Sequence, residues 1–443
     1  MQTIISKIKK YCRKKDYELL KELLEGINNY DIAEILDRLN PIEQKIVLNH
    51  LDNERIAEIL PEMDDYEDIT KNIDNLLLTD LLMLMDDDDA TDILQDLSKR
   101  RQEKLLRMME KGQSEEIRQL LQYKEDTAGG LMTLSFLAVK SDFTVGKSID
   151  LIKKSSDDLE IINYLYVTDD DGHLEGVVSI RQLLIFPDNK IIGDIMNRDI
   201  IYVDVATDQE EVAKLVSKYD LLAIPVVDYE KKLMGIVTFD DIMDVIDEEN
   251  AEDIYAMAGS SSIEEETNSV FLIAGLRFPW LFTNLFGGII AASVLGLYKM
   301  TLAKAISLSF FIPVITGMGG NAGLQTSTTT IRGLSTGEIH INEIGKILFR
   351  EIRIGVIVGI LCGFVVGAFS YLWQGHIFLG AVVGISMMCS ITIAALVGVI
   401  APFSFKKLGI DPAISSGPFV TTSNDIMGIL IYLTIATYMI DKL

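Results

Sequence analysis

Cysteine, histidine and tryptophan are scarce in this chain of 443 residues, which contains 3, 4 and 2 of them. Cys12, Cys362 and Cys389 are widely separated and show no CxxC spacing, so the sequence predicts neither a disulfide framework nor a zinc site. A Walker A motif is absent, and no GxGxxG string stands between a strand and a helix. Since no nucleophile–base set is present either, we expect no enzyme activity.

Positive charge is scarce in the first 270 residues. They hold 60 of the 66 acidic residues but 30 of the 40 lysines and arginines, a net charge of −30, whereas the remainder carries +4. A negative field of this size repels nucleic acid and concentrates cations, so nucleic acid is not an expected partner. The first eleven residues contain lysines but no long apolar core. We therefore expect no cleavable signal peptide and an N-terminus in the cytoplasm.

Residues 1–125 are predicted to form a helical domain with short turns. The string Ile32-Ala-Glu-Ile-Leu36 returns at positions 56–60, and apolar side chains recur at helical spacing between residues 77 and 109. Self-similarity of this kind indicates stacked helical units, so we expect a superhelical array. A helical bundle with one accidental repeat is the alternative.

The period changes to strand-like alternation in residues 126–248. Leu165–Ser179 has the pattern of a strand hairpin, and the pattern returns without a gap at Ile224–Thr238. Each hairpin leads into a predicted helix. The sequence thus predicts two tandem α/β modules, at about 126–190 and 191–248. A helix dense in carboxylates, Asp240–Met257, leads into a connecting segment that we assign to residues 249–270.

From residue 271 to 443 the chain is mostly apolar. Runs of about 20 apolar residues are typical of helices that span a bilayer. We predict five spans, near residues 278–298, 303–331, 352–373, 377–405 and 413–440. Lysine and arginine concentrate before the first span and in the second-to-third and fourth-to-fifth connections, with Lys299 and Lys304 as exceptions. The positive-inside rule then places the N-terminus inside the cell membrane and the C-terminus outside.

Asp425 is a carboxylate inside the last predicted span. It follows Asp411 by 14 residues and precedes Asp441 by 16, about 21 and 24 Å along a helix. A charge at that depth is costly unless it faces water, a partner or an ion, so transport is the default interpretation. A protonated or hydrogen-bonded Asp between packed helices is the alternative. The polar strings at 415–418 and 421–424 offer hydroxyls and carbonyls, which suit a hard cation.

The second predicted span contains breaks and polar side chains. Pro313 and the glycines of the stretch 317–325 predict non-helical backbone, which membranes tolerate only when it is buried in protein or lines a cavity. Asn321 and Gln325 are one helical turn apart and can face one channel. The third span instead has glycines at every fourth position, which predicts close packing of a neighbouring helix. These are Gly355, Gly359, Gly363 and Gly367.

Three strings resemble the membrane signatures of the MgtE family of magnesium transporters, and the two hairpins resemble a pair of CBS domains. The strings are Arg277-Phe-Pro-Trp280, Gly319-Gly-Asn-Ala-Gly-Leu-Gln325 and the stretch from Asp411 to Asp425. The resemblance covers essentially the whole chain. It implies a multidomain protein with an all-α superhelical N domain, α/β tandem CBS domains, a connecting "plug" helix and an α-helical transmembrane bundle with five spans.

The family resemblance also implies partners and ligands. We expect a homodimer in the lipid bilayer with one pore at its two-fold axis, where Asp425 faces a hydrated Mg²⁺ ion and the carbonyls near Gly417 and Thr421 assist. Asn424 departs from the hydroxyl residue expected before that aspartate, which leaves selectivity against cobalt and manganese open. CBS pairs often bind nucleotides, so ATP or another adenine nucleotide is a candidate ligand, although no specific phosphate loop is present.

The family's regulatory Mg²⁺ sites fall on carboxylates of this chain. For each of them alone, a solvated acidic surface is the alternative. The N-domain partner lies within residues 86–92, where we name Asp88, Asp89 and Asp92. The other positions are Asp208, Glu210, Asp220, Asp241, Asp244, Glu249, Glu252 and Asp253.

The leading interpretation is a magnesium channel or transporter that cytoplasmic Mg²⁺ closes. Uptake would be passive, driven by about 2.3 kcal/mol per charge per 100 mV of membrane potential. One alternative is a proton- or sodium-coupled carrier of another divalent cation, with Asp425 carrying the proton. A second is a CBS-based membrane sensor that transports nothing, for which Asp425 and the broken second span would be unnecessary.

Overall fold

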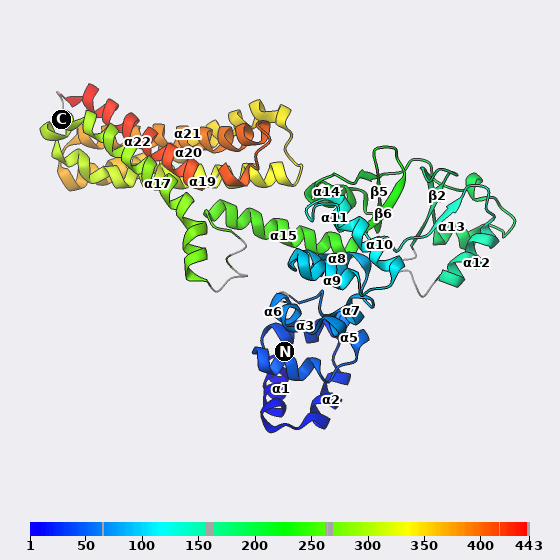
Figure 1. Cartoon of the computed structure of the whole chain (residues 1–443). Helices are drawn as coiled ribbons and strands as arrows, with labels where there is room; N and C mark the ends of the chain where they lie inside the picture. The colour runs from blue at the N-terminus through cyan, green and yellow to red at the C-terminus, as the bar shows by residue number, and fades with distance from the viewer. Residues whose placement is uncertain (64–65, 156–162, 262–263, 265–268, 416, 441–443) are drawn as a thin grey trace. The chain divides into compact units, whose positions relative to one another are not determined.

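The structure, a computed structural model, describes residues 1–63, 66–155, 163–261, 264, 269–415 and 417–440 (Figure 1). Ser262, Ser416 and residues 441–443, which enter the predicted linker, the last signature and the predicted topology, lie outside the described residues. The chain forms two compact units, Met1–Ile246 and Asp247–Leu443. Helix α15 (Phe239–Ala258) contains the division between them.

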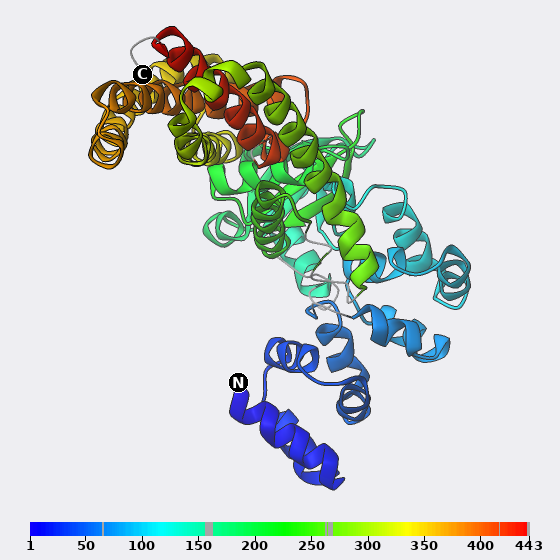
Figure 2. The same ribbon diagram turned by 90° about the vertical axis from the view of Figure 1, so that its left-hand side faces the viewer.

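The N domain is built from short helices whose apolar faces share one core, which extends from Ile8 to Ile117. Figure 2 shows these helices following one another along the chain. They are α1 (Gln2–Lys14), α2 (Tyr17–Glu25), α3 (Asn29–Asp37), α4 (Pro41–Leu48), α5 (Asn53–Ile59), α6 (Glu67–Asn72), α7 (Asn75–Leu82), α8 (Asp87–Gln95), α9 (Lys99–Leu106) and α10 (Lys111–Leu120). The predicted helical domain is confirmed.

Two arginines show that the N domain repeats itself. Arg55 donates to Asn29 Oδ1 at 2.8 Å and to the Ile27 carbonyl at 2.8 Å. Arg101 donates to Asn75 Oδ1 at 2.9 Å and to the Ile73 carbonyl at 2.8 Å. The second set follows the first at one constant sequence interval. The two arginines therefore make the same hydrogen bonds at equivalent positions of two units, as expected for a repeat array.

The two α/β modules have the same topology. The first contains β1 (Ala138–Lys140), α12 (Val145–Ser155), β2 (Tyr164–Thr168), β3 (Leu174–Ser179), α13 (Ile180–Ile185) and η1 (Ile192–Asp194). The second contains β4 (Val203–Asp204), α14 (Gln209–Tyr219), β5 (Ala223–Val227), β6 (Leu233–Thr238) and α15, and the earlier helix α11 (Ala128–Leu131) packs in its core. In each sheet the outer strand pairs parallel with the middle one, and the hairpin is antiparallel with a register shift at an equivalent place.

The hairpin turns of the two modules pair with each other. The Leu174 amide donates to the Lys231 carbonyl at 3.1 Å, and the Leu233 amide donates to the Gly172 carbonyl at 3.0 Å. Tyr166, Ala223 and Ile236 are buried together in a small apolar cluster that includes both sheets. The two modules therefore form one paired body with approximate internal symmetry.

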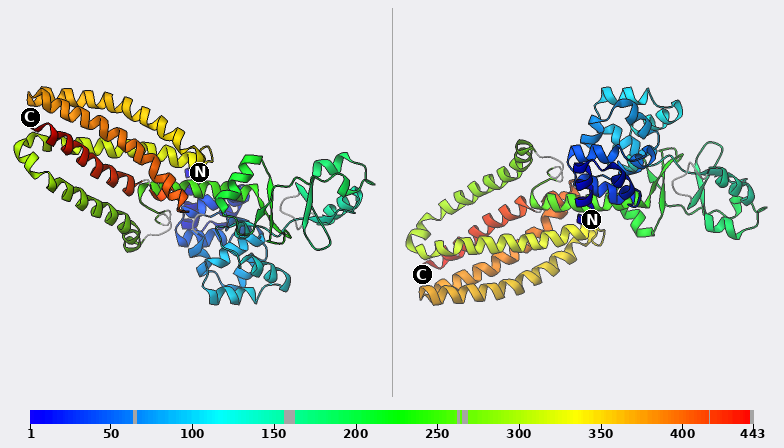
Figure 3. Two further views of the ribbon diagram at one scale, coloured as in Figure 1. Left: turned by 90° about the horizontal axis from the view of Figure 1, so that it is seen from above. Right: turned by 90° about the horizontal axis from the view of Figure 1, so that it is seen from below.

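Among its residues that the structure describes, the second unit contains five helices that are long and apolar enough to cross a membrane, which confirms the predicted five spans. The long helices run alongside one another (Figure 3). The elements are α17 (Val270–Leu297), α18 (Lys299–Lys304), η2 (Ile306–Phe311), α19 (Ile312–Ser335), η3 (Ile341–Glu343), α20 (Ile344–Gln374), α21 (Ile377–Lys407), η4 (Ala413–Ser415) and α22 (Pro418–Tyr438). Helix α22 packs against α17, α19 and α21.

The glycine stripe of α20 packs directly on α21. A Cβ atom at Gly359 would lie 2.9 Å from the Met388 carbonyl oxygen, and one at Gly367 would lie 2.7 Å from the Gly380 carbonyl oxygen. Gly380 and Gly384 on α21 meet the stripe from the other side. Such backbone-to-backbone contact requires small residues, and the predicted packing role of the stripe is confirmed.

The predicted break in the second span is wrong. Residues 312–335 form one continuous helix, and Pro313 lies in its first turn, where a missing N–H removes no helical hydrogen bond. The irregular backbone lies earlier, in the 3₁₀ turn η2. The glycines serve helix packing instead: a Cβ atom at Gly319 would lie 2.9 Å from Ser390 Oγ.

Candidate functional site

Helix α22 begins at a glycine–proline pair. Gly417 is the N-cap residue and Pro418 lies in the first turn, where proline is well tolerated. The Gly417 carbonyl accepts hydrogen bonds from the Thr421 amide at 3.2 Å and the Thr421 hydroxyl at 2.9 Å. Both lone pairs of this predicted pore carbonyl are thus engaged in the first turn of the helix.

Asp425 lies nearer the start of α22 than the sequence predicted. It is seven residues after Pro418 and 13 before Tyr438, about 10 and 20 Å along the helix. The helix begins later than the predicted span of 413–440, because Gly417 and Pro418 start it several residues after Asp411. The Asp425 side chain is half-buried within one chain. A carboxylate in an apolar helix at this depth still requires water or a cation.

Asn321 and Gln325 lie on one exposed face of α19. Gly323, which packs against α22, lies nearly opposite to them around the helix. The two predicted amides therefore stay together on one face, as their spacing required. They do not take part in the contact between α19 and α22.

Helix α17 contacts α22 at Thr422, the residue that directly follows Thr421. The Thr422 hydroxyl donates to Asn284 Oδ1 at 3.2 Å, and a Cβ atom at Gly287 would overlap the Thr422 side chain. Polar side chains therefore join the two helices within their apolar surroundings. Sequence reasoning did not single out Asn284, although an amide in an apolar helix is a usable signal.

The end of α15 reaches the beginnings of α17 and α22. Gly259, with φ of +72°, lies so that an added Cβ atom would be 3.4 Å from Trp280 Cβ and 3.6 Å from Pro418 Cγ. One at Gly417 would be 2.7 Å from the Met257 carbonyl oxygen. Arg277 Nε donates to the buried Glu264 carboxylate at 2.8 Å. The connecting helix thus contacts the same turn that starts α22.

Carboxylates from three parts of the first unit gather together. Glu62 follows α5, Asp86 and Asp89 lie at the start of α8, and Asp240 and Asp241 lie at the start of α15. Burial raises the pKa of Glu62, and the charges of Asp244, Asp240 and Asp241 raise it further. Asp240 acts in the same way on the pKa of Asp86. We name these five residues with Asp244 the acidic cluster.

Asp89 and Asp241 are the most perturbed members of the acidic cluster. Burial, followed by the charges of Asp86 and Asp241, raises the pKa of Asp89 to about 7. Burial also raises the pKa of Asp241 to about 6, although hydrogen bonds from Thr238 oppose the shift. Each charge that acts on Asp89 belongs to another carboxylate. Carboxylates crowded in this way favour a proton or a cation between them.

Asp241 also has a local structural role. It accepts the Thr238 amide at 3.3 Å and the Thr238 hydroxyl at the start of α15. Gln182 does the same for Ser179 at the start of α13 in the first module. The two positions are equivalent in the tandem repeat, and the second carries a charge where the first is neutral.

The remaining predicted regulatory residues are dispersed. Asp208 caps the start of α14, Glu210 pairs with Lys214 at 2.6 Å, and Asp220 ends that helix, about 18 Å away along its axis. These three cannot share one ion. Asp88 and Asp92 both lie in α8. Asp88 is 9% exposed, and the charge of Asp92 raises the pKa of Asp89. Glu249, Glu252 and Asp253 lie in the second half of α15.

Glu62 and Asp240 were missed as site residues, and Asp86 lies in the predicted range 86–92 but was not one of the residues named there. Asp86 and Asp240 lie in acidic strings that the sequence shows, but nothing in the string distinguishes them from their neighbours. Glu62 follows a helix of the repeat array with no sequence signal of its own. It joins the site only through tertiary packing.

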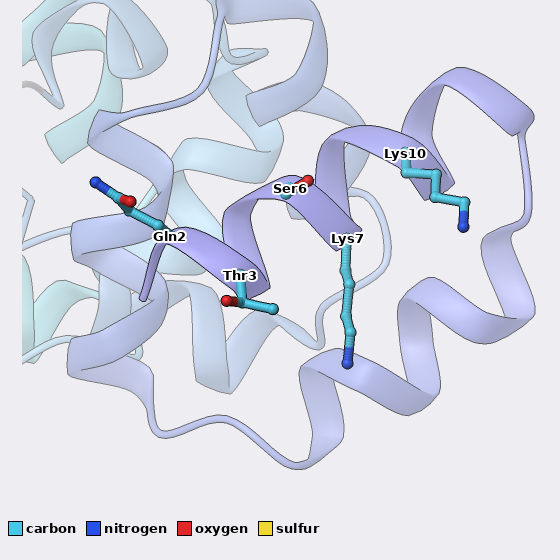
Figure 4. Close-up of a pocket in the computed structure, with 5 residues that line it drawn as sticks. All are labelled: Gln2, Thr3, Ser6, Lys7 and Lys10. Atoms are coloured by element: carbon cyan, nitrogen blue, oxygen red, sulfur yellow. The ribbon is translucent and has the colours of Figure 1, made fainter.

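Two further features carry no assigned function. Asp169, Asp171 and His173 bring ligand atoms within 4.8 Å of one another in the β2–β3 turn, where Asp169 accepts the backbone amides of the other two. A surface hollow is lined by side chains of α1 alone (Figure 4). It gathers no groups from separate elements. The lining residues are Gln2, Thr3, Ser6, Lys7 and Lys10.

The fold and the sites define a multi-pass membrane protein whose spanning helices follow a helical domain and a CBS pair. Three family models match in that order. The MgtE intracellular N domain matches residues 27–126, the CBS domain matches 128–188 and 192–248, and the divalent cation transporter MgtE matches 312–435. Magnesium transporter MgtE of Bacillus subtilis is 35% identical over 96% of this chain and 94% of its own length.

Other relatives and solved structures agree. Magnesium transporter MgtE of Thermus thermophilus is 34% identical over 96% of both chains, and that of Enterococcus faecalis is 41% identical over 73% of this chain and 71% of its own. The crystal structure of the cytosolic domain of the Mg²⁺ channel MgtE in complex with ATP superposes with a TM-score of 0.52 at 34% identity. It covers 54% of this chain and 99% of that chain. The chain belongs to the MgtE family of magnesium transporters.

Proposed function

We propose that this chain is a magnesium channel for uptake, closed when cytoplasmic Mg²⁺ binds the acidic cluster. The observation that carries the proposal is that Asp241 of α15 acts on Asp89 of α8; both carboxylates are half-buried, and their pKa values are raised by burial and by other carboxylates. A hard divalent cation neutralises such a cluster with oxygen ligands alone. Mg²⁺ therefore stabilises the arrangement in which the N domain and α15 lie together.

The ion pathway is proposed at Asp425. Mg²⁺ dehydrates reluctantly, so a carboxylate that recognises the hydrated ion avoids the largest desolvation cost. Thr421 supports this site, with Asn321 and Gln325 as further lining on α19. The Gly417 carbonyl can face the ion only if the Thr421 hydroxyl turns away, because that hydroxyl now donates a hydrogen bond to the carbonyl. The exposed face of α19 lies at the two-fold axis of a homodimer in this proposal.

The connecting helix transmits the sensor state. Helix α15 starts in the acidic cluster and ends against Gly417, where α22 begins. Binding that favours one state shifts the population by no more than its difference in affinity for the two states. We propose the remaining regulatory ligands at Asp208, Glu210, Asp220, Asp244, Glu249, Glu252 and Asp253, with Asp88 and Asp92 in the N domain.

The proposal also includes a membrane orientation and a nucleotide ligand. The N-terminus and the CBS pair lie in the cytoplasm and the C-terminus outside, by the charges of the connections. The CBS pair binds ATP in this proposal, because a solved relative of this region is a complex with ATP. Nucleotide binding is tested by titrating ATP into the purified chain.

The decisive experiment is Mg²⁺ flux into liposomes that contain the purified full chain, recorded at low and high Mg²⁺ on the cytoplasmic side. We expect flux at low Mg²⁺ and closure at high Mg²⁺. A chain that conducts nothing in either condition is a sensor only. A flux that depends on a proton or sodium gradient identifies a coupled carrier.

A further inference from the structure

Asn424 is a buried amide inside a membrane-spanning helix. Its side chain is 2% exposed, and neither Nδ2 nor Oδ1 has a hydrogen-bond partner among the residues that the structure describes. A buried polar group without a partner is unfavourable, because it has lost its hydrogen bonds to water and gained none in the protein. An unsatisfied group of this kind requires an explanation beyond stability.

The amide lies directly over a glycine of α19. A Cβ atom at Gly323 would overlap Asn424 Nδ2 and would lie 3.0 Å from Val420 Cγ1. No side chain other than hydrogen fits there while Asn424 keeps its place. Gly323 therefore provides the space into which the amide of α22 is inserted.

Helix α21 holds the same segment of α19 from another side. A Cβ atom at Gly398 would lie 2.5 Å from the Gly323 carbonyl oxygen and 3.1 Å from the Ser327 amide nitrogen. Because backbone meets backbone there, α19 cannot move away from Asn424 without separating from α21. The Asn424 amide therefore packs against a segment of α19 that α21 holds in place.

The contact of Asn424 with Gly323 fixes the direction in which the Asp425 side chain points. Adjacent residues of an α-helix point about 100° apart, since one turn contains 3.6 residues. Rotation of α22 about its axis would move Asn424 off Gly323 and turn the Asp425 carboxylate by the same angle. The position of the carboxylate therefore depends on the Asn424–Gly323 contact.

We propose that the Asn424–Gly323 contact positions Asp425 and thereby sets how this chain discriminates Mg²⁺ from Co²⁺. The inference rests on the proposed pore at Asp425. Mg²⁺ demands near-ideal octahedral oxygen ligands and keeps its waters, whereas Co²⁺ binds protein ligands more readily. A carboxylate displaced by a rotated helix no longer suits the hydrated Mg²⁺ ion. Asn424 is a positioning residue, and it does not itself contact the ion.

A suppressor pair tests the contact in the full chain, reconstituted in liposomes. Gly323→Ala should reduce Mg²⁺ flux about tenfold, equivalent to about 1.4 kcal/mol. Gly323→Ala combined with Asn424→Ser should restore most of that flux, because serine leaves room for the methyl group. The matched control is Gly320→Ala, one turn away on α19, where the added methyl group meets Thr421 Cγ2 at an ordinary 3.5 Å. It should behave like the parent protein.

The ratio of Mg²⁺ flux to Co²⁺ flux separates positioning from simple packing. Asn424→Ser and Asn424→Leu should each shift the ratio about threefold or more, a change that corresponds to about 0.7 kcal/mol. Asn424→Leu should keep or raise the unfolding temperature, because it removes an unpartnered amide. A packing role alone predicts a lower unfolding temperature with an unchanged ratio.

The proposal is overturned if both Asn424 variants keep the parent ratio, or if the double variant conducts no better than Gly323→Ala. Asp425→Ala, measured in parallel, separates this failure from failure of the pore assignment. Loss of flux in Asp425→Ala together with parent ratios in the Asn424 variants rejects the positioning role alone. Normal flux in Asp425→Ala rejects both.

Discussion

Asp89, at the start of α8, has its pKa raised to about 7 by burial, by the charge of Asp86 and by the charge of Asp241, which lies at the start of α15. Asp89 and Asp241 are far apart in the sequence and lie in different domains of the first unit. Because both side chains are carboxylates, their negative charges repel each other when the N domain and α15 lie together. A bound proton or cation removes this repulsion.

The first prediction concerns pH. The folded-state pKa values of Asp89 and Asp241 exceed the ordinary 3.8, so the folded chain retains protons that the unfolded chain releases. Stability without Mg²⁺ should therefore fall as the pH rises from about 4 to above 7. Mg²⁺ should restore it above pH 7 and have little effect below pH 6, where protons compete. The measurement is the unfolding temperature in EDTA and in Mg²⁺.

The matched variants for the pH experiment are Asp89→Asn and Asp150→Asn. The first removes a member of the acidic cluster and should flatten the pH dependence. The second removes an exposed carboxylate of α12 and should leave it unchanged. An unfolding temperature that stays constant or rises with pH in EDTA would contradict the assignment.

The second prediction concerns closure. Asp241→Asn with Asp244→Asn removes two charges of the acidic cluster, and asparagine can still accept the Thr238 hydrogen bond that starts α15. Channels should stay open to about tenfold higher cytoplasmic Mg²⁺, within the usual range of coupling between sites. Single-channel recording against Mg²⁺ measures this. Closure at the parent concentration, in this variant and in a chain without residues 1–125, would place the sensor elsewhere.

The third prediction concerns Asp425. Asp425→Ala and Asp425→Asn should lower Mg²⁺ flux at least about tenfold, because the pathway loses the charge that attracts a divalent ion. Glu338→Gln, in the exposed connection between α19 and α20, is the matched control and should conduct normally. Normal flux and selectivity in Asp425→Ala would show that the pathway lies elsewhere.

The fourth prediction concerns packing of α20 on α21. Gly363→Ala places a methyl group against the Gly384 carbonyl, which cannot move aside, and should destabilise the bundle by about 1–3 kcal/mol. Gly345→Ala on the same helix meets open space and should be neutral. Thermal unfolding in detergent compares the two. Equal unfolding temperatures would show that the two helices separate without cost.

The fifth prediction concerns topology. A reporter fused to the C-terminus should lie outside the cytoplasm, and one inserted between Ile341 and Ile344 should lie inside, because lysine and arginine concentrate in that connection. Protease accessibility in right-side-out vesicles distinguishes the two. Both reporters on one side would contradict an odd number of spans between the two reporter positions.

The sequence by itself determined the order and kind of the elements. Helical spacing, strand alternation and apolar runs are local patterns, so the N domain, the tandem hairpins and the five spans could be read from neighbouring residues. The glycine stripe of α20 was readable for the same reason, because its four-residue period specifies a face. Asp425 stood out because a charge among apolar residues needs no tertiary context to be unusual.

Only the tertiary structure decided which distant residues meet. Glu62 and Asp240 join Asp89 through the stacking of whole domains, which no local pattern specifies. Pro313 and its glycines looked like a break, but the proline lies in the first turn and the glycines admit neighbouring helices, so α19 stays regular. Asn424 stood out in the sequence as a departure from the family signature, but its contact with Gly323 is visible only in the tertiary structure. Burial and contact depend on the whole packed arrangement, and the sequence alone fixes neither.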